Sequence, residues 1–291
     1  MSGPDPGVRL PAVAGSFYPA RQESIRGVVD ACLANAPEPS LGERPIGVLV
    51  PHAGLVYSGT VAAAGWRSLL RDAGVDPTVV ILGTNHSASL DGVAVFEAGA
   101  WRTPLGDVAV DAEVAGRILA LGRPYAAGRE AHRDEHSIEV QLPIVASLRP
   151  HARIVPCSVA AGTGHQAVDA GRRLGSLLAA LRAGGREVLL AISTDMAHYP
   201  AHDESVRVTE RLAPSITALD PVALAVLERS ETRSGVRGMA CGMCGIQPSV
   251  LGMAALRAMG AAGGTVVGAA TSADAGASPD RTVGYLAVAF A

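Results

Sequence analysis

Residues 188–199 read Val-Leu-Leu-Ala-Ile-Ser-Thr-Asp-Met-Ala-His-Tyr, so an apolar run passes directly into a polar segment. A short apolar run bounded in this way is typical of a buried strand. Comparable runs occur at 46–50, 79–82, 154–159, 265–270 and 283–290, and helical patterns occur at 24–34, 60–73, 112–121, 137–148, 165–183, 204–218, 221–228 and 248–259. Because strands alternate with helices, the sequence predicts an α/β fold, a three-layer αβα sandwich around a mostly parallel or mixed central sheet.

A different pattern lies between Val93 and Val110, where two short apolar segments flank Trp101-Arg-Thr-Pro-Leu-Gly-Asp107. The Pro and Gly of that stretch favour a turn, so this part of the chain predicts a small β-hairpin excursion. The sequence has no internal repeat and no low-complexity linker, and 291 residues suit one large α/β domain. We therefore expect residues 1–291 to form a single domain.

The composition excludes several classes of function. Hydrophobic residues make up 48% of the chain and charged residues 18%, which is typical of a globular protein. The net charge is −3 and the basic residues are scattered, which argues against a nucleic-acid partner. All 24 basic residues are Arg, so a phosphate-binding or Schiff-base Lys is excluded. We therefore expect no nucleotide and no pyridoxal phosphate (PLP) as cofactor.

The sequence also bears on cellular location. Residues 1–15 lack the basic segment and apolar run of a signal peptide, and no apolar run approaches the roughly 20 residues of a transmembrane helix. We therefore expect a cytoplasmic protein without a membrane partner, whose cysteines stay reduced. Cys32 and Cys157 fall in helical and strand patterns and are expected in the core, whereas Cys241 and Cys244 fall in a glycine-rich turn.

Side chains that bind metals follow three of the predicted strands. His52 follows the strand at 46–50, His86 the strand at 79–82, and His198 the strand at 188–192. The carboxyl ends of parallel strands open onto one edge of a sheet, where ligands bind. Cys244 precedes the last predicted helix, whose N-terminus favours a thiolate. Imidazoles together with a thiolate predict a transition-metal site.

Short motifs in a specific order now connect the chain with a known family. They are Pro11-Ala-Val-Ala-Gly-Ser-Phe-Tyr-Pro19, Pro51-His-Ala-Gly54, Leu82-Gly-Thr-Asn-His86, Arg102-Thr-Pro-Leu-Gly-Asp107, Asp134-Glu-His-Ser-Ile-Glu139, Ser193-Thr-Asp-Met-Ala-His198 and Cys244-Gly-Ile-Gln-Pro248. In these segments the chain resembles the Memo family, also called AmmeMemoRadiSam system protein B. The fold of that family is similar to that of the LigB-type class III extradiol dioxygenases.

The resemblance implies a set of roles for the site residues. His52, His86 and Cys244 would be the metal ligands, and Asp195 and His198 would be the catalytic residues beside them. Cys244 is chosen because the Cys-Gly-x-x-Pro pattern begins there, and Cys241 remains an alternative sulfur three residues upstream. We further expect Asp195 to orient His198 by accepting a ring N–H. Other pocket residues are expected to be Asn85, Tyr57, Glu135, His136 and Cys241.

The thiolate distinguishes this site from that of the dioxygenases, which hold Fe(II) with two histidines and a carboxylate. Because a thiolate is a softer ligand than a carboxylate, the bound ion is expected to be one iron or copper ion, with zinc as a further option. Ring-cleaving activity is not expected from the shared fold. The resemblance therefore implies a metal-binding, redox-active enzyme that acts on a small substrate or on dioxygen. It also implies radical-SAM and AMMECR-type proteins as partners.

Three other interpretations remain open. His132-Arg-Asp-Glu-His136 matches the H-x-x-E-H pattern of inverted zinc proteases. Cys241-x-x-Cys244 matches a dithiol redox motif. The third interpretation is a non-catalytic module that binds a small molecule, peptide or protein in the same pocket.

Overall fold

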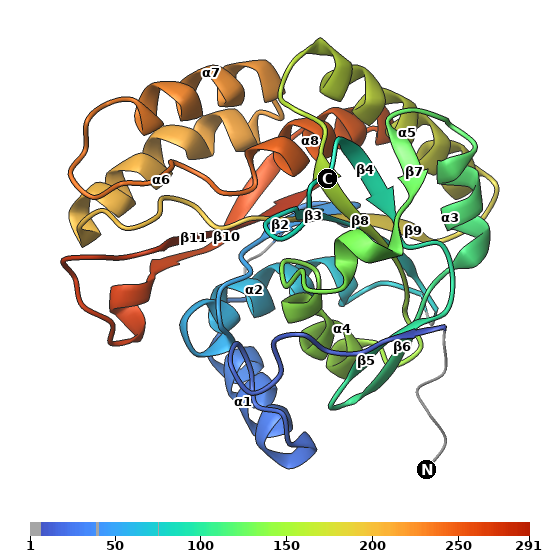
Figure 1. Cartoon of the computed structure of the whole chain (residues 1–291), viewed down its shortest axis with the longest axis horizontal. Helices are drawn as coiled ribbons and strands as arrows, with labels where there is room; N and C mark the ends of the chain where they lie inside the picture. Colours follow the sequence, from blue (N-terminus) through green and yellow to red (C-terminus); the bar gives the residue numbers. More distant parts are fainter. Residues whose placement is uncertain (1–6, 39–40, 75) are drawn as a thin grey trace.

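The computed structural model describes residues 7–38, 41–74 and 76–291 (Figure 1). The expected domain 1–291 includes residues 1–6, 39–40 and 75, which lie outside this range. The strands are β1 (Val8–Arg9), β2 (Gly47–Val50), β3 (Thr78–Thr84), β4 (Gly92–Val95), β5 (Ala100–Thr103), β6 (Gly106–Ala109), β7 (Tyr125–Ala127), β8 (Arg153–Ala160), β9 (Val188–Ser193), β10 (Gly264–Thr271) and β11 (Gly284–Phe290). The α-helices are α1 (Gln22–Asn35), α2 (Leu55–Leu70), α3 (Ala112–Leu119), α4 (Leu142–Leu148), α5 (His165–Ala183), α6 (His202–Thr217), α7 (Pro221–Thr232) and α8 (Ile246–Met259), and the 3-10 helices are η1 (Arg129–His132), η2 (Glu139–Gln141) and η3 (Ser272–Ala275).

Among the residues that the structure describes, the main sheet has the strand order β10-β11-β2-β9-β3-β8-β4-β7. Its centre is parallel, because β9 pairs in parallel with both β2 and β3, and β3 pairs in parallel with β8. Antiparallel pairs join β10 to β11, β11 to β2 and β4 to β8. The central strands are buried along their whole length, as expected for a parallel sheet covered on both faces. The predicted α/β sandwich with a mixed sheet is confirmed.

Helices cover the sheet on both faces (Figure 1). Helices α5 and α8 pack on β9 and β3 on one side, whereas α2, with α1 and α4 beside it, packs on β2 and β11 on the other. Helix α5 approaches α8 closely at Gly171 and Gly175, where an added Cβ would collide with backbone oxygens of α8. Replacing either glycine would therefore push α8 away from α5 and disturb the loop that leads into α8.

The structure differs from the predicted elements in two places. The predicted hairpin is present as β5 and β6, but β1 joins it as a parallel third strand and Gly92–Val95 belongs to the main sheet. The helix predicted at 137–148 begins as α4 only at Leu142, which places Pro143 in the first turn, where proline is best tolerated in an α-helix. The preceding residues instead form turns and η2, which contribute buried polar side chains to the site.

None of the helices within the described ranges combines the length and the apolar character needed to cross a bilayer.

Candidate metal centre

Three neighbouring strands deliver the site residues to one edge of the sheet. Strands β2, β9 and β3 lie side by side and parallel, and His52, Asp195 and His86 follow them in turn. Cys244 approaches from the loop before α8. The next residue is Gly245, where an added Cβ would collide with the Thr194 side chain, so only glycine lets this loop sit against the strand end.

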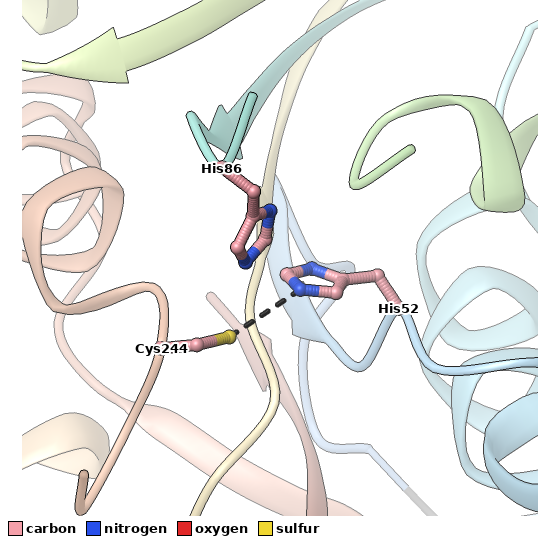
Figure 2. Close-up of side chains that lie close together, drawn as sticks. All are labelled: His52, His86 and Cys244. Carbon is pink, nitrogen blue, oxygen red and sulfur yellow. Dashed lines mark hydrogen bonds between the residues drawn. The ribbon is translucent and has the colours of Figure 1, made fainter. Parts of the chain in front are cut away.

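His52, His86 and Cys244 point toward one another (Figure 2). His52 Nε2 lies 3.3 Å from Cys244 Sγ, and one donor atom from each of the three residues lies within 4.8 Å of the other two. In a tetrahedral site with metal–N near 2.05 Å and metal–S near 2.3 Å, N and S are about 3.6 Å apart. The separation is thus close to the one that a bound ion imposes, and the donor set fits a transition metal.

Glu135 is the acidic partner of His86. Its buried carboxylate accepts a hydrogen bond from the His86 backbone at 2.5 Å and lies 3.0 Å from His86 Nδ1. Further backbone N–H groups of His136 and Ser137 donate to the same carboxylate. Burial alone would raise the pKa of Glu135, but these hydrogen bonds hold it well below its usual range. The ionised carboxylate therefore keeps the proton of His86 on Nδ1 and leaves Nε2 free for a metal.

A second group of donors, His86, Glu135 and His136, also lies within 4.8 Å. Two backbone N–H groups and His86 Nδ1 already surround Glu135 Oε1. We therefore treat this carboxylate as a hydrogen-bond acceptor that supports His86. The His136 ring stacks on His86 with centroids 4.7 Å apart and meets His52 edge-on at 5.4 Å, so it forms one wall of the site.

The thiol of Cys244 does not behave as the sequence predicts. Burial and the nearby Asp195 carboxylate raise the pKa of Cys244 well above its usual value. The expectation that the helix N-terminus favours a thiolate is therefore wrong for the metal-free protein, because desolvation outweighs the helix dipole. A metal ion would have to displace the thiol proton.

Asp195 and His198 are both present at the site, but not in the expected pairing. His198 Nδ1 lies 2.8 Å from the carbonyl oxygen of Met196, which therefore accepts the ring N–H. The Asp195 carboxylate instead accepts backbone N–H bonds from His52 at 2.7 Å and Ala53 at 3.3 Å. The expectation that Asp195 orients His198 is thus wrong, since Asp195 holds the turn that carries His52.

The remaining predicted pocket residues have differing surroundings. Asn85 exchanges hydrogen bonds with the backbone of Ala88, so its side chain shapes the turn that carries His86. Tyr57 lies on the first turn of α2 and is 43% exposed. Cys241 is half-buried, and its carbonyl oxygen accepts the backbone N–H of His198. Cys241 therefore contacts the site through the backbone of His198.

The inverted-protease interpretation is contradicted by the position of His132. This side chain is fully buried and packs edge-on against the rings of Phe96 and Trp101, and its Nε2 lies 3.0 Å from the Ala94 carbonyl oxygen. Since η1 ends at His132 and η2 begins only at Glu139, His132 and His136 share no helical face. His132 is a core residue.

A buried network that was not predicted from the sequence fastens residues 9–18 beside the site. The Glu139 carboxylate accepts hydrogen bonds from Arg9 at 2.6 Å and Tyr18 at 2.6 Å, and from the backbone of Ala12 and Val13. At the end of this segment the Phe17 ring lies 4.7 Å from the His136 ring. A glutamate within an apolar pattern is the signal that would have identified this anchor.

Comparison with known proteins finds relatives that match nearly the whole chain and a solved structure of similar fold. The family model described as Memo-like protein matches residues 9–289. A MEMO1 family protein of Methanopyrus kandleri is 35% identical over 97% of this chain and 98% of its own length. One from Aquifex aeolicus is 34% identical over 97% of this chain and 99% of its own. The crystal structure of an uncharacterized protein from Escherichia coli K12 has a similar fold, with a TM-score of 0.53 and 15% identity over 84% of this chain and 99% of that one.

Proposed function

The chain belongs to the Memo family, and on that premise we propose that it is a redox-active enzyme with one transition-metal ion held by His52, His86 and Cys244. The observation that carries the proposal is the convergence of two imidazoles and one thiol, whose donor atoms lie within 4.8 Å of one another. Its substrate would be a small molecule or dioxygen.

The identity of the donors favours iron or copper over the hard cations. Imidazole and thiolate suit copper, zinc and iron, whereas magnesium and calcium prefer oxygen ligands. A bound iron or copper ion would supply a one-electron redox couple beside the substrate. Zinc would fit the same donors without such a couple.

The surrounding residues have separate tasks in this proposal. Because His198 donates its Nδ1–H to Met196, its Nε2 is the ring atom that can take up or return a proton. His86 and His136 remain partly exposed, with side-chain exposures of 32% and 21%, so a small ligand can approach from their side. Asp195 positions His52 through its backbone bonds.

The experiment is metal analysis after anaerobic purification. We expect about one equivalent of iron or copper in the wild type and its loss in His52→Ala, His86→Ala and Cys244→Ala. Cys241→Ala is the matched control, because this neighbouring cysteine is absent from the group of converging donors, and it should keep the metal. Wild-type protein that takes up no metal even after reconstitution would contradict the proposal.

A second measurement separates an enzyme from a binding module. A reversible one-electron couple in the reconstituted wild type, absent from Cys244→Ala, would support redox function. A zinc-only protein without such a couple would favour the alternative, a module that binds a small molecule, a peptide or companion proteins of the radical-SAM and AMMECR types.

A further inference from the structure

The tautomer of His52 decides whether this side chain can bind a metal through Nε2. A neutral imidazole carries one proton, either on Nδ1 or on Nε2. Nε2 of His52 lies 3.3 Å from Cys244 Sγ, and Nδ1 lies 3.0 Å from the hydroxyl oxygen of Ser193. A proton on Nε2 would block the metal position, so the direction of the hydrogen bond at Ser193 is decisive.

The Ser193 hydroxyl has a single hydrogen, and its neighbours fix where that hydrogen points. Ser193 Oγ lies 2.6 Å from the carbonyl oxygen of Ser137, which can only accept a hydrogen bond. The hydroxyl hydrogen must therefore point to Ser137. The two lone pairs of Ser193 are left to accept hydrogen bonds, one from Gln141 Nε2 at 2.9 Å and the other from His52 Nδ1.

The orientation of the Gln141 amide is itself fixed by two neighbours. Trp66 Nε1 can only donate and lies 2.7 Å from Gln141 Oε1. The Pro51 carbonyl can only accept and lies 2.8 Å from Gln141 Nε2. A reversed amide would pair two donors at one end and two acceptors at the other. Trp66, Gln141 and Ser193 are all 0% exposed, so solvent cannot substitute for either partner.

We propose that Gln141 and Ser193 are positioning residues that hold His52 as the Nδ1–H tautomer and so direct its Nε2 lone pair at the metal position. The proposal rests on the metal site proposed above. The two histidines then differ in their supporting acceptor, a neutral hydroxyl for His52 and an ionised carboxylate for His86. His52 is therefore held in its metal-binding form without adding a negative charge to the site.

Two substitutions separate the contributions of the pair. Ser193→Ala removes the acceptor, leaves Nδ1–H unpaired in a buried position and lets the proton move to Nε2. Loss of such a supporting partner weakens metal binding by about 10- to 100-fold. Gln141→Met keeps the length of the side chain but removes the N–H that occupies one lone pair of Ser193, so the hydroxyl is held less firmly. The Ser137 carbonyl still accepts the hydroxyl hydrogen, so we expect His52 to keep its Nδ1–H form and metal binding to weaken less than in Ser193→Ala.

The experiment combines nitrogen-15 NMR of the histidines in the metal-free protein with zinc affinity measured by chelator competition. We expect the wild-type His52 signal, assigned with His52→Ala, to show a protonated Nδ1 and a bare Nε2. Ser158→Ala is the matched control. It removes another fully buried strand hydroxyl, one without a hydrogen-bond partner in the described part of the chain. Ser193→Thr retains a hydroxyl and should restore most of the affinity.

The outcomes separate this proposal from the proposed function. A proton on Nε2 in the wild type would overturn the positioning role, as would a zinc affinity of Ser193→Ala within about twofold of the Ser158→Ala control. If Ser193→Ala fails to fold, the wild-type spectrum and Gln141→Met still decide. Protein that shows Nδ1–H at His52 and yet binds no metal would contradict the proposed function while supporting the hydrogen-bond chain.

Discussion

Glu139→Gln tests whether one carboxylate fastens the N-terminal segment to the body of the protein. The Arg9 and Glu139 side chains are 4% and 0% exposed, so their ion pair is almost completely removed from water. Glutamine has the same shape but presents an NH2 group on one side. That group faces either Arg9 and the Ala12 N–H or Tyr18 and the Val13 N–H.

The cost follows from the less damaging of these two orientations. With the NH2 group toward Tyr18, the phenol oxygen can turn and accept, but the Val13 N–H loses its acceptor, which costs about 1–3 kcal/mol. Arg9 also loses its counter-charge, although the carbonyls of His132 and Glu135 still accept from its guanidinium. Breaking a buried pair on one side costs about 3–5 kcal/mol, and we expect the total in this range.

Urea unfolding measures the loss of free energy, and hydrogen exchange of residues 9–18 shows whether the segment opens locally. Glu130→Gln is the control, since the Glu130 side chain is 77% exposed. A loss below about 1 kcal/mol for Glu139→Gln, or unchanged exchange in residues 9–18, would show that this carboxylate does not fasten the segment.

Three further predictions concern the site and its surroundings. Glu135→Gln should weaken metal binding about 10- to 100-fold in chelator competition, because His86 loses its ionised acceptor, whereas Asp134→Asn at a 68% exposed side chain should not. Burial lowers the pKa of His132 to about 4 in the folded protein. In the unfolded chain this side chain is protonated near pH 6.5, whereas in the folded protein it stays neutral down to about pH 4. Stability should therefore be fully present above about pH 6.5 and fall toward pH 4 by up to about 1.4 kcal/mol per pH unit, and His132→Leu should flatten this slope in urea titrations at several pH values. Since burial raises the pKa of the Cys244 thiol well above its usual value, metal affinity should rise with pH by up to about tenfold per unit, and a pH-independent affinity would contradict displacement of the thiol proton.

Much of the fold is readable from the sequence because the central strands are continuous apolar runs. Strands β2, β3, β8, β9, β10 and β11 appear within one or two residues of the predicted bounds, and α5 matches its predicted range. The short strands β1 and β7 are not readable, since two or three residues carry no periodicity, and the pairing of β4 with the main sheet is not readable either. Their place depends on pairing with distant strands.

The candidate site is likewise predictable where it depends on the ends of the sheet strands, and not where it depends on the local turns. The convergence of His52, His86 and Cys244 is predictable, because strand ends of a parallel sheet meet at one edge. The hydrogen-bond partners of Asp195 and His198 are not predictable, since these partners depend on which backbone groups the turns present. The protonation of Cys244 also escapes the sequence, because burial is a property of the whole fold.

The antiparallel pairing of β11 with β2 has a consequence for the order of events during synthesis. β2, the strand that leads to His52, gains one of its two neighbours from residues 284–290, which are made long after His52 itself. Cys244 is likewise made late, well after both histidines. A growing chain therefore carries His52 and His86 without the third candidate ligand and without the completed sheet that holds them. Under the proposed function, an ion held by all three donors would bind only after residues 284–290 are made, and it would have to reach the folded protein rather than the nascent chain.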